Sequence, residues 1–144
     1  MNLIVLKPDF TWYTRPDSTL CRVREDFFLP EEFVSAEACR CRYIKVIRAG
    51  KAIQPRFAGR YFEPLCEGWL YYGLDRDGNA NPCIDRSTVL EEGTYTPFPD
   101  NETVAAICKA SSVMTFRRGD LVIVEEPGPT ILNQGDSFNS ITIK

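Results

Sequence analysis

The amino-acid sequence predicts an α+β domain built mainly of β-strands, with one clear helix and a few short helical turns. Short apolar runs rich in β-branched and aromatic residues alternate along the 144 residues with Gly, Pro, Asn and Asp clusters that mark turns. One segment, at about residues 103–113, instead shows the three/four spacing of an amphipathic helix. No repeat, low-complexity segment or linker divides the sequence, so we expect a single domain over residues 1–144.

Four segments in the first half of the chain have the composition of strands. They are residues 3–6, 18–28, 40–48 and 69–74. Each is apolar or aromatic, and each is followed by proline or by turn residues, which end strands. The segment 40–48 is rich in arginine and lysine, which favours a solvated edge strand because charges on edge strands prevent aggregation. Residues 53–62 are expected to form a short helix or an ordered loop.

The second half begins with the clear helix. Asp100 or Asn101 is suited to cap it, and Glu102 places an acid in its first turn, where the helix dipole favours negative charge. One stripe of the helix is expected to be buried, and it consists of Val104, Ile107, Cys108 and Ser111. Two strands should follow, over residues 121–126 and 137–144, with a proline-rich stop and a Gly-Asp turn between them.

The composition excludes several classes of function. The chain has no histidine, so it cannot contain a Ser-His-Asp or Cys-His catalytic group or an imidazole metal ligand. Its net charge of −3 argues against a general nucleic-acid-binding protein. The N-terminal apolar run is too short for a signal peptide, and no run is long enough for a membrane span. We therefore expect a cytoplasmic protein that binds neither nucleic acid nor membrane.

Several patches of the sequence resemble the fumarylacetoacetate hydrolase family. The opening IVLKPD is similar to the family's Phe-x-Lys-Pro strand, and residues 42–69 are similar to its central segment, in which a strand leads into Gly-Lys. The stretch from the helix through residue 138 resembles the family's last segment, with matches at Ser111, Met114, Thr115, Phe116, Gly119, Asp120, Pro127, Gly135 and Asp136. The resemblance implies a mixed β-sandwich roll and a homodimer.

The same resemblance implies that the family's metal site is lost. The family holds a divalent metal with a Glu-x-Glu pair on one strand and a later aspartate. An ungapped alignment through Gly50-Lys51 places Cys39 and Cys41 at the glutamate positions and Leu70 at the aspartate position, lining the former cavity. None of these side chains is a hard oxygen ligand of the kind that Mg²⁺ prefers.

The family's substrate loop and catalytic histidine are also missing. At the Thr-Gly-Thr-Pro loop this chain has Val124, Glu125, Glu126 and Pro127. Much of the family's catalytic segment has no counterpart in a chain of this length. The resemblance therefore implies a shortened, degenerate member with no catalytic residues, no bound metal and no cofactor.

The cysteines and the remaining acids have simpler interpretations than catalysis. The six cysteines are expected to be reduced and mostly packed as small hydrophobes. A thiol metal site at Cys39 and Cys41, with Cys66 nearby, is the alternative, although a structural zinc site generally has four ligands. Asp75 is expected to bind local backbone amides in a turn.

The preferred function is a non-catalytic role in binding or assembly, with a homodimer as the expected state. Two alternatives stay open. One is a divergent hydrolase or decarboxylase that acts on β-diketo or oxo acids through a rearranged metal site. The other is a protein that binds a small molecule in the former cavity beside Cys39, Cys41 and Leu70. Three oxygen ligands that converge near this cavity would favour the enzyme.

Overall fold

The computed structural model describes residues 1–22, 26–138 and 141–144, and it confirms an α+β fold that consists mainly of strands. The strands are β1 (Leu3–Leu6), β2 (Trp12–Arg15), β3 (Leu20–Cys21), β4 (Ser35–Val46), β5 (Phe62–Leu74), β6 (Ala80–Asn81), β7 (Thr88–Glu91), β8 (Leu121–Glu125), β9 (Thr130–Leu132), β10 (Ser137–Phe138) and β11 (Ile141–Thr142). The helical elements are η1 (Asp17–Thr19), η2 (Pro55–Arg60) and α1 (Asn101–Ser111).

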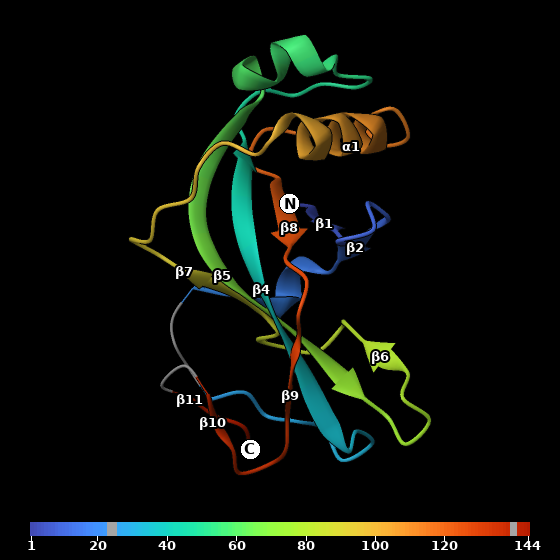
Figure 1. Cartoon of the computed structure of the whole chain (residues 1–144), viewed down its shortest axis with the longest axis vertical. Helices are drawn as coiled ribbons and strands as arrows, with labels where there is room; N and C mark the ends of the chain where they lie inside the picture. Colours follow the sequence, from blue (N-terminus) through green and yellow to red (C-terminus); the bar gives the residue numbers. More distant parts are fainter. Residues whose placement is uncertain (23–25, 139–140) are drawn as a thin grey trace.

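Two long antiparallel strands, β4 and β5, run along most of the length of the molecule (Figure 1). Around them the main sheet has the order β2-β1-β8-β4-β5-β7-β3, with β6 paired to β5 and β9 paired to β4. The pairs β1–β8 and β3–β7 are parallel, so the sheet is mixed. A break in register between Tyr43 and Ile44 marks an irregularity in the β4–β5 pairing, and irregularities of this kind bend a strand.

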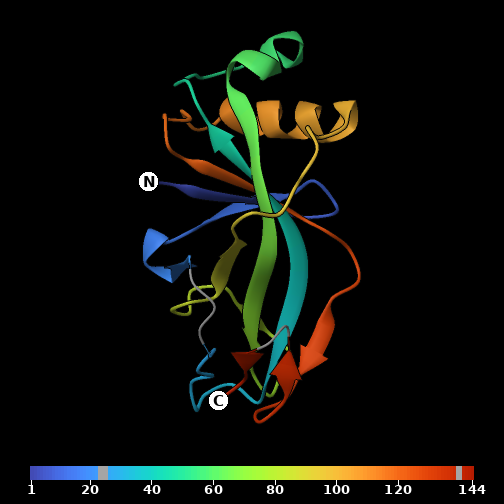
Figure 2. The same cartoon turned by 90° about the vertical axis from the view of Figure 1, so that its left-hand side faces the viewer.

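Helix α1 lies at one end of the long strands, next to η2 (Figures 1 and 2). The Asp100 side chain caps it by accepting a hydrogen bond of 2.7 Å from the Thr103 amide. The predicted stripe is buried, and its members are Val104, Ile107, Cys108 and Ser111. The helix occupies 101–111, so the expected segment was correct to within two residues at each end.

The residues that match the family at the helix connect it to the chain around Gly50. The Ser111 hydroxyl, which is fully buried, accepts a hydrogen bond of 2.9 Å from the Ile53 amide. Gly50 exchanges two backbone hydrogen bonds with Phe116, of 2.9 and 2.8 Å. A Cβ atom at Gly50 would lie 2.7 Å from the Tyr61 ring, so only glycine fits this contact. These matched residues therefore have structural roles.

The sheet separates two of the three apolar clusters. The cluster under α1 contains Ile4, Leu6, Ile44, Val46, Phe62, Val104, Ile107, Phe116 and Val122, among others. The cluster on the other face, which we name the inner core, contains Leu3, Val5, Cys39, Cys41, Tyr43, Cys66, Leu70, Tyr72, Leu90, Leu121 and Ile123. A third cluster lies near the C-terminus of the chain and includes Phe27, Tyr71, Leu132 and Ile143.

Three expectations about individual strands were wrong. Most of the basic segment 40–48 belongs to the central strand β4, which pairs with both β5 and β8 and ends at Val46. Arg40 and Arg42 lie at intermediate exposure and form ion pairs, so they do not require an edge. In place of a strand over 18–28 the chain forms η1 and the short β3, while residues 23–25, including Val23, lie outside the described residues. The last segment forms two short paired strands, β10 and β11, and residues 139–140 are likewise outside the described part.

No helix in the described part of the chain is both long enough and apolar enough to cross a membrane.

Candidate functional site

The two cysteines that the resemblance places at metal-ligand positions point into the inner core, together with Leu70. Cys39 pairs with Leu70 across β4 and β5, and Cys41 pairs with Gly68. The exposed fractions of Cys39, Cys41 and Leu70 are 3%, 0% and 0%. The sequence alignment therefore selected residues that do lie together, and they are enclosed by apolar side chains from β1, β5, β7 and β8.

Burial also determines the chemistry of these thiols. It raises the pKa of Cys39 to about 12, and the negative charges of Glu125 and Glu37 add to the effect. Burial raises the pKa of Cys41 well above its ordinary value, and that of Cys66 to about 11. A thiol is a good metal ligand or nucleophile only as the thiolate. These three groups therefore stay protonated and unreactive at neutral pH.

A polar network borders the inner core, and it centres on Glu125. We name it the Glu125 network, and it consists of Lys7, Tyr13, Arg15, Tyr72 and Glu125. Its members come from β2, β5 and β8 and from the residue after β1. Arg15, Tyr72 and Glu125 are 3%, 4% and 6% exposed. Burying a charge this deeply costs free energy unless the charge is paired or hydrogen-bonded, and the hydrogen bonds of the network reduce this cost.

The hydrogen bonds of the network run in one direction. Arg15 Nε donates to the Tyr13 hydroxyl at 2.9 Å, and the two tyrosine hydroxyls lie 2.7 Å apart. The Tyr72 hydroxyl is 2.5 Å from Glu125 Oε1, and Lys7 Nζ is 3.2 Å from Oε2 of the same carboxylate. Since an ionised carboxylate can only accept, Tyr72 donates to Glu125 and Tyr13 donates to Tyr72. Burial and these neighbours raise the pKa of the Tyr72 hydroxyl.

Arg15 anchors the far end of the network. Its Nη1 donates to the Ser87 carbonyl at 3.1 Å and lies 3.3 Å from the Thr88 hydroxyl. Its guanidinium carbon lies 4.7 Å from the centre of the Tyr72 ring, which is a cation–π distance. Nη2 has no hydrogen-bond partner among residues 1–22, 26–138 and 141–144. The network thus joins β2, β5, β8 and the start of β7 through one buried cation.

The four residues that the resemblance places at the substrate loop separate in the structure. Glu125 enters the network, whereas Glu126 lies on the outside and accepts a hydrogen bond of 3.0 Å from Arg42 Nε. Val124 is partly buried against the cluster under α1, and Pro127 is exposed. This separation follows from β8, in which alternate side chains point to opposite faces of the sheet.

Sequence reasoning missed most of the Glu125 network. Tyr72 belongs to an aromatic run that indicated core or interface, and Lys7 was noted only as part of the IVLKPD match. Tyr13 and Arg15 were not identified at all. Their alternate spacing places both on one face of β2, but the segment 12–15 is too short and too polar to indicate a strand by itself.

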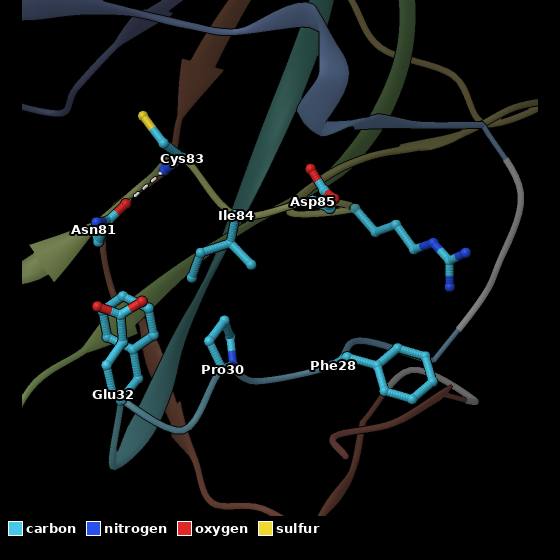
Figure 3. Close-up of a pocket in the computed structure, with 9 residues that line it drawn as sticks. Phe28, Pro30, Glu32, Asn81, Cys83, Ile84 and Asp85 are labelled. Atoms are coloured by element: carbon cyan, nitrogen blue, oxygen red, sulfur yellow. Dashed lines mark hydrogen bonds between the residues drawn. The ribbon is translucent and has the colours of Figure 1, made fainter.

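A separate open pocket of about 540 Å³ lies near the other end of the fold (Figure 3). It is lined by Phe28, Pro30, Glu32, Phe33, Asn81, Cys83, Ile84, Asp85 and Arg86. Cys83 is the exposed thiol of the chain, and its backbone amide donates to the Asn81 side chain at 2.8 Å. The Cys83 sulfur points away from Pro30 and Phe28 in Figure 3, so the polar groups do not converge on one point.

The carboxylates and thiols in the described ranges do not form a metal site. No group of three or more His, Cys, Asp or Glu side chains that could hold a metal ion occurs in the part of the chain that the structure describes. Asp75 binds its own turn, because its Oδ1 accepts from the amides of Asp77 and Asn79 at 2.9 Å each. Asp75 thus binds local backbone amides as the sequence predicted, and the hydrogen bonds from Asn79 and its neighbours lower its pKa.

No family model matches this sequence, and no curated protein matches it either. Solved structures, however, share its fold. The maleylpyruvate hydrolase from Sphingobium sp. SYK-6 superposes with a TM-score of 0.71 at 13% identity, over 93% of this chain and 62% of that protein. The 5-carboxymethyl-2-hydroxymuconate delta-isomerase from Mycobacterium smegmatis gives a TM-score of 0.73 at 13% identity, over 93% and 69%.

The fold is also shared by a protein from Yersinia pestis CO92 that is described as a putative fumarylacetoacetate hydrolase family protein. It has a TM-score of 0.63 at 12% identity, with 93% of this chain and 85% of that chain covered. The protein therefore has the α+β, mainly β fold of fumarylacetoacetate hydrolase family proteins, as the sequence resemblance implied. The chain spans less than two thirds of the length of the maleylpyruvate hydrolase.

Proposed function

We propose that this chain is a non-catalytic, shortened member of the fumarylacetoacetate hydrolase family that uses the family scaffold for binding or assembly. The observation that supports the proposal is the enclosure of Cys39, Cys41 and Leu70 in the inner core. These are the positions at which the resemblance implies the metal ligands. A divalent hard cation requires several oxygen ligands with room for water, and this packing provides neither.

The position of Glu125 supports the same proposal. This residue is the one acid of the former substrate loop that turns inward, and both of its oxygens are engaged by Tyr72 and Lys7. Glu125 is 6% exposed, and both of its oxygens accept hydrogen bonds inside the fold, so the carboxylate is not open to a substrate or a hydrated metal ion. We infer that the network has a structural role, linking four strands where the family has its reaction centre.

Neither alternative function has comparable support. The divergent hydrolase requires convergent oxygen ligands, and the described residues offer no such group. The small-molecule binder would use the cavity beside Cys39, Cys41 and Leu70, but none of these residues lines any of the three pockets identified in the described ranges. Assembly as a homodimer, in the reducing cytoplasm that suits six free thiols, completes the proposal.

Calorimetric titration with divalent metals tests the loss of the metal site. The protein is titrated separately with Mg²⁺, Mn²⁺ and Zn²⁺, and we expect no saturable heat for Mg²⁺ or Mn²⁺ in the micromolar to low millimolar range. The physical reason is that the three side chains offer two protonated thiols and a hydrocarbon. Micromolar binding of Mg²⁺ or Mn²⁺ would overturn the non-catalytic proposal.

Zinc requires a separate control because exposed thiols bind it adventitiously. We compare the wild-type protein with Cys83→Ser and with the double variant Cys39→Ser/Cys41→Ser. The proposal predicts that any Zn²⁺ binding disappears with the exposed Cys83 and is unaffected by the buried pair. Zn²⁺ binding that is lost in the Cys39→Ser/Cys41→Ser variant but kept in Cys83→Ser would instead establish a thiol metal site, provided that circular dichroism shows the double variant to be folded.

A further inference from the structure

The outward face of α1 has two alanines at its middle, of which Ala105 is exposed and Ala106 is partly buried against the cluster under the helix. The residues of α1 and its C-terminal end that line the groove beside the helix are Glu102, Ala105, Ala106, Lys109, Ser112 and Val113. They follow the spacing of a single helix face, opposite the stripe that packs on the sheet. Charges occupy only two of the helical positions, and two alanines lie between them. We name this set the outer face of α1.

Two grooves flank this face. The larger, of about 770 Å³, lies between α1 and the loop that leads into β2, where Phe10, Thr11 and Trp12 form the opposite wall. The smaller, of about 410 Å³, lies between α1 and the chain at Ile53 and Pro55. The two grooves share Ala105, Lys109 and Ser112, so they form one continuous surface across the helix. At the edges of this surface lie Phe10, which is 40% exposed, and Val113, which is 69% exposed.

The charges on the outer face are arranged symmetrically about its small residues. Glu102 and Lys109 are seven residues apart, which corresponds to about 10.5 Å along the helix axis and to the same side of it. The midpoint between them falls between Ala105 and Ala106. No ion pair involving Glu102 or Lys109 is found within the described residues. A second α1 that lies antiparallel across this midpoint would place each glutamate opposite a lysine.

We propose that two copies of this chain associate through the outer faces of their α1 helices, antiparallel across a two-fold axis at Ala105 and Ala106. The inference rests on the assembly role proposed above and identifies its surface. A two-fold contact pairs residue i with residue j and residue j with residue i, so one Glu102–Lys109 pair is repeated on both sides of the axis. The alanines permit close approach of the two helices, and the flanking grooves receive the neighbouring side chains.

The ends of the helix are consistent with this arrangement. Phe98, before the helix, and Val113, after it, are both exposed apolar residues, at 42% and 69%. A contact between them across the axis would cover apolar surface at each end of the pairing. Asp9, which lines the larger groove, adds a second carboxylate to the surface that would receive the partner's lysine.

A charge-swap experiment tests the interface in solution. Glu102→Lys and Lys109→Glu are prepared separately, and their masses are measured by sedimentation equilibrium over a range of protein concentrations. Each variant places like charges opposite each other twice in a symmetric pair, so we expect the dimer dissociation constant to rise by about tenfold or more. When the two variants are mixed, both pairs become Lys–Glu again, and the mixed dimer should recover wild-type affinity.

The control is Lys45→Glu, an exposed lysine on β4 that lies outside both grooves, and it should leave dimerisation unchanged. Thermal unfolding is measured for every variant to show that each is folded. A wild-type protein that stays monomeric at high concentration would overturn both the assembly proposal and this interface. If the wild-type protein is a dimer and neither substitution changes the dissociation constant, the α1 interface is overturned and the assembly role stays intact. The same holds if the two variants fail to form a mixed dimer of wild-type affinity.

Discussion

Glu125 is the buried acid at the centre of the polar network beside the inner core. Its carboxylate is buried, and it accepts hydrogen bonds from a phenol on one oxygen and an ammonium group on the other. The cost of burying the charge is offset only because every one of these donors is in place. The network is therefore sensitive to the loss of any single hydroxyl.

Tyr72→Phe removes the central hydroxyl of the Glu125 network with little change in volume. Glu125 then loses one buried donor and Tyr13 loses its acceptor, so we expect the free energy of unfolding to fall by about 1–3 kcal/mol. Urea unfolding followed by circular dichroism measures this change. Tyr95→Phe is the matched control, because Tyr95 is 82% exposed, and it should change stability by less than about 0.5 kcal/mol. Equal effects of the two substitutions would show that the network contributes nothing.

At the scale of elements, the β4–β5 pair positions the inner core, and Gly68 allows it to close. Gly68 lies on β5 between Cys41 of β4 and Leu90 of β7. A Cβ atom there would meet the Val89 carbonyl oxygen at 2.1 Å and the Tyr43 ring at 2.5 Å. Both neighbours belong to packed strands and cannot move aside. The absence of a side chain at this position therefore allows the Tyr43 ring to cover the strand.

Gly68→Ala should destabilise the protein strongly. Accommodating the methyl group requires β7 or the Tyr43 ring to shift, and we expect a loss of about 3 kcal/mol in the free energy of unfolding. Gly59→Ala is the control, since a Cβ atom at that position in η2 meets nothing within 4 Å. It should leave the urea midpoint unchanged or raise it slightly, because alanine reduces the entropy of the unfolded chain. Similar midpoints for the two variants would contradict the close approach at Gly68.

At the scale of the whole molecule, the buried thiols couple stability to alkaline pH. Burial raises the pKa of Cys39 to about 12 and that of Cys66 to about 11, compared with 9.0 for an ordinary thiol. Between pH 9 and 11 the unfolded chain therefore releases thiol protons that the folded protein retains. The folded protein holds these protons more tightly than the unfolded chain does. The contribution of the thiols to the free energy of unfolding is therefore fully present below pH 9 and falls as the pH rises.

We therefore expect the free energy of unfolding to decrease from pH 9 to pH 11, by up to about 1.4 kcal/mol per pH unit for each thiol. The double variant Cys39→Ala/Cys66→Ala should show a shallower decrease over this range, although it is less stable at pH 7. Urea unfolding at several pH values measures both slopes. Cys83→Ala, which removes the exposed thiol, is the control and should keep the wild-type slope. Parallel slopes for the double variant and the wild-type protein would contradict the effect of burial.

Local patterns in the sequence were sufficient for the elements whose signal is local. The helix was predicted because its cap at Asp100 and its buried stripe both depend on residues within four positions of each other. The turn at Asp75 was correct for the same reason. Strand β4 was identified as a strand but wrongly placed at an edge, because the pairing partners of a strand lie far away in the sequence.

The residues of the candidate site could also be predicted only in part from the sequence. The resemblance alone led to Cys39, Cys41, Leu70 and Glu125, and the structure brings all four to the inner core or its border. Lys7, Tyr13 and Arg15 could not be found in this way, because each of them is 57 or more residues from Tyr72 in β5, the partner that defines their role. Short strands such as β2 also carry too little pattern to indicate which side chains turn inward.

The sequence by itself thus determined that the chain lacks histidine, carries no Glu-x-Glu pair at the expected strand and contains one amphipathic helix. These are statements about which side chains are present and about neighbours within a few residues. Only the tertiary structure decided that Cys39 and Cys41 are enclosed, that Glu125 is paired with Tyr72 and Lys7, and that Ala105 and Lys109 of α1 are exposed. Burial and charge pairing arise from contacts between distant segments, and folding alone brings those segments together.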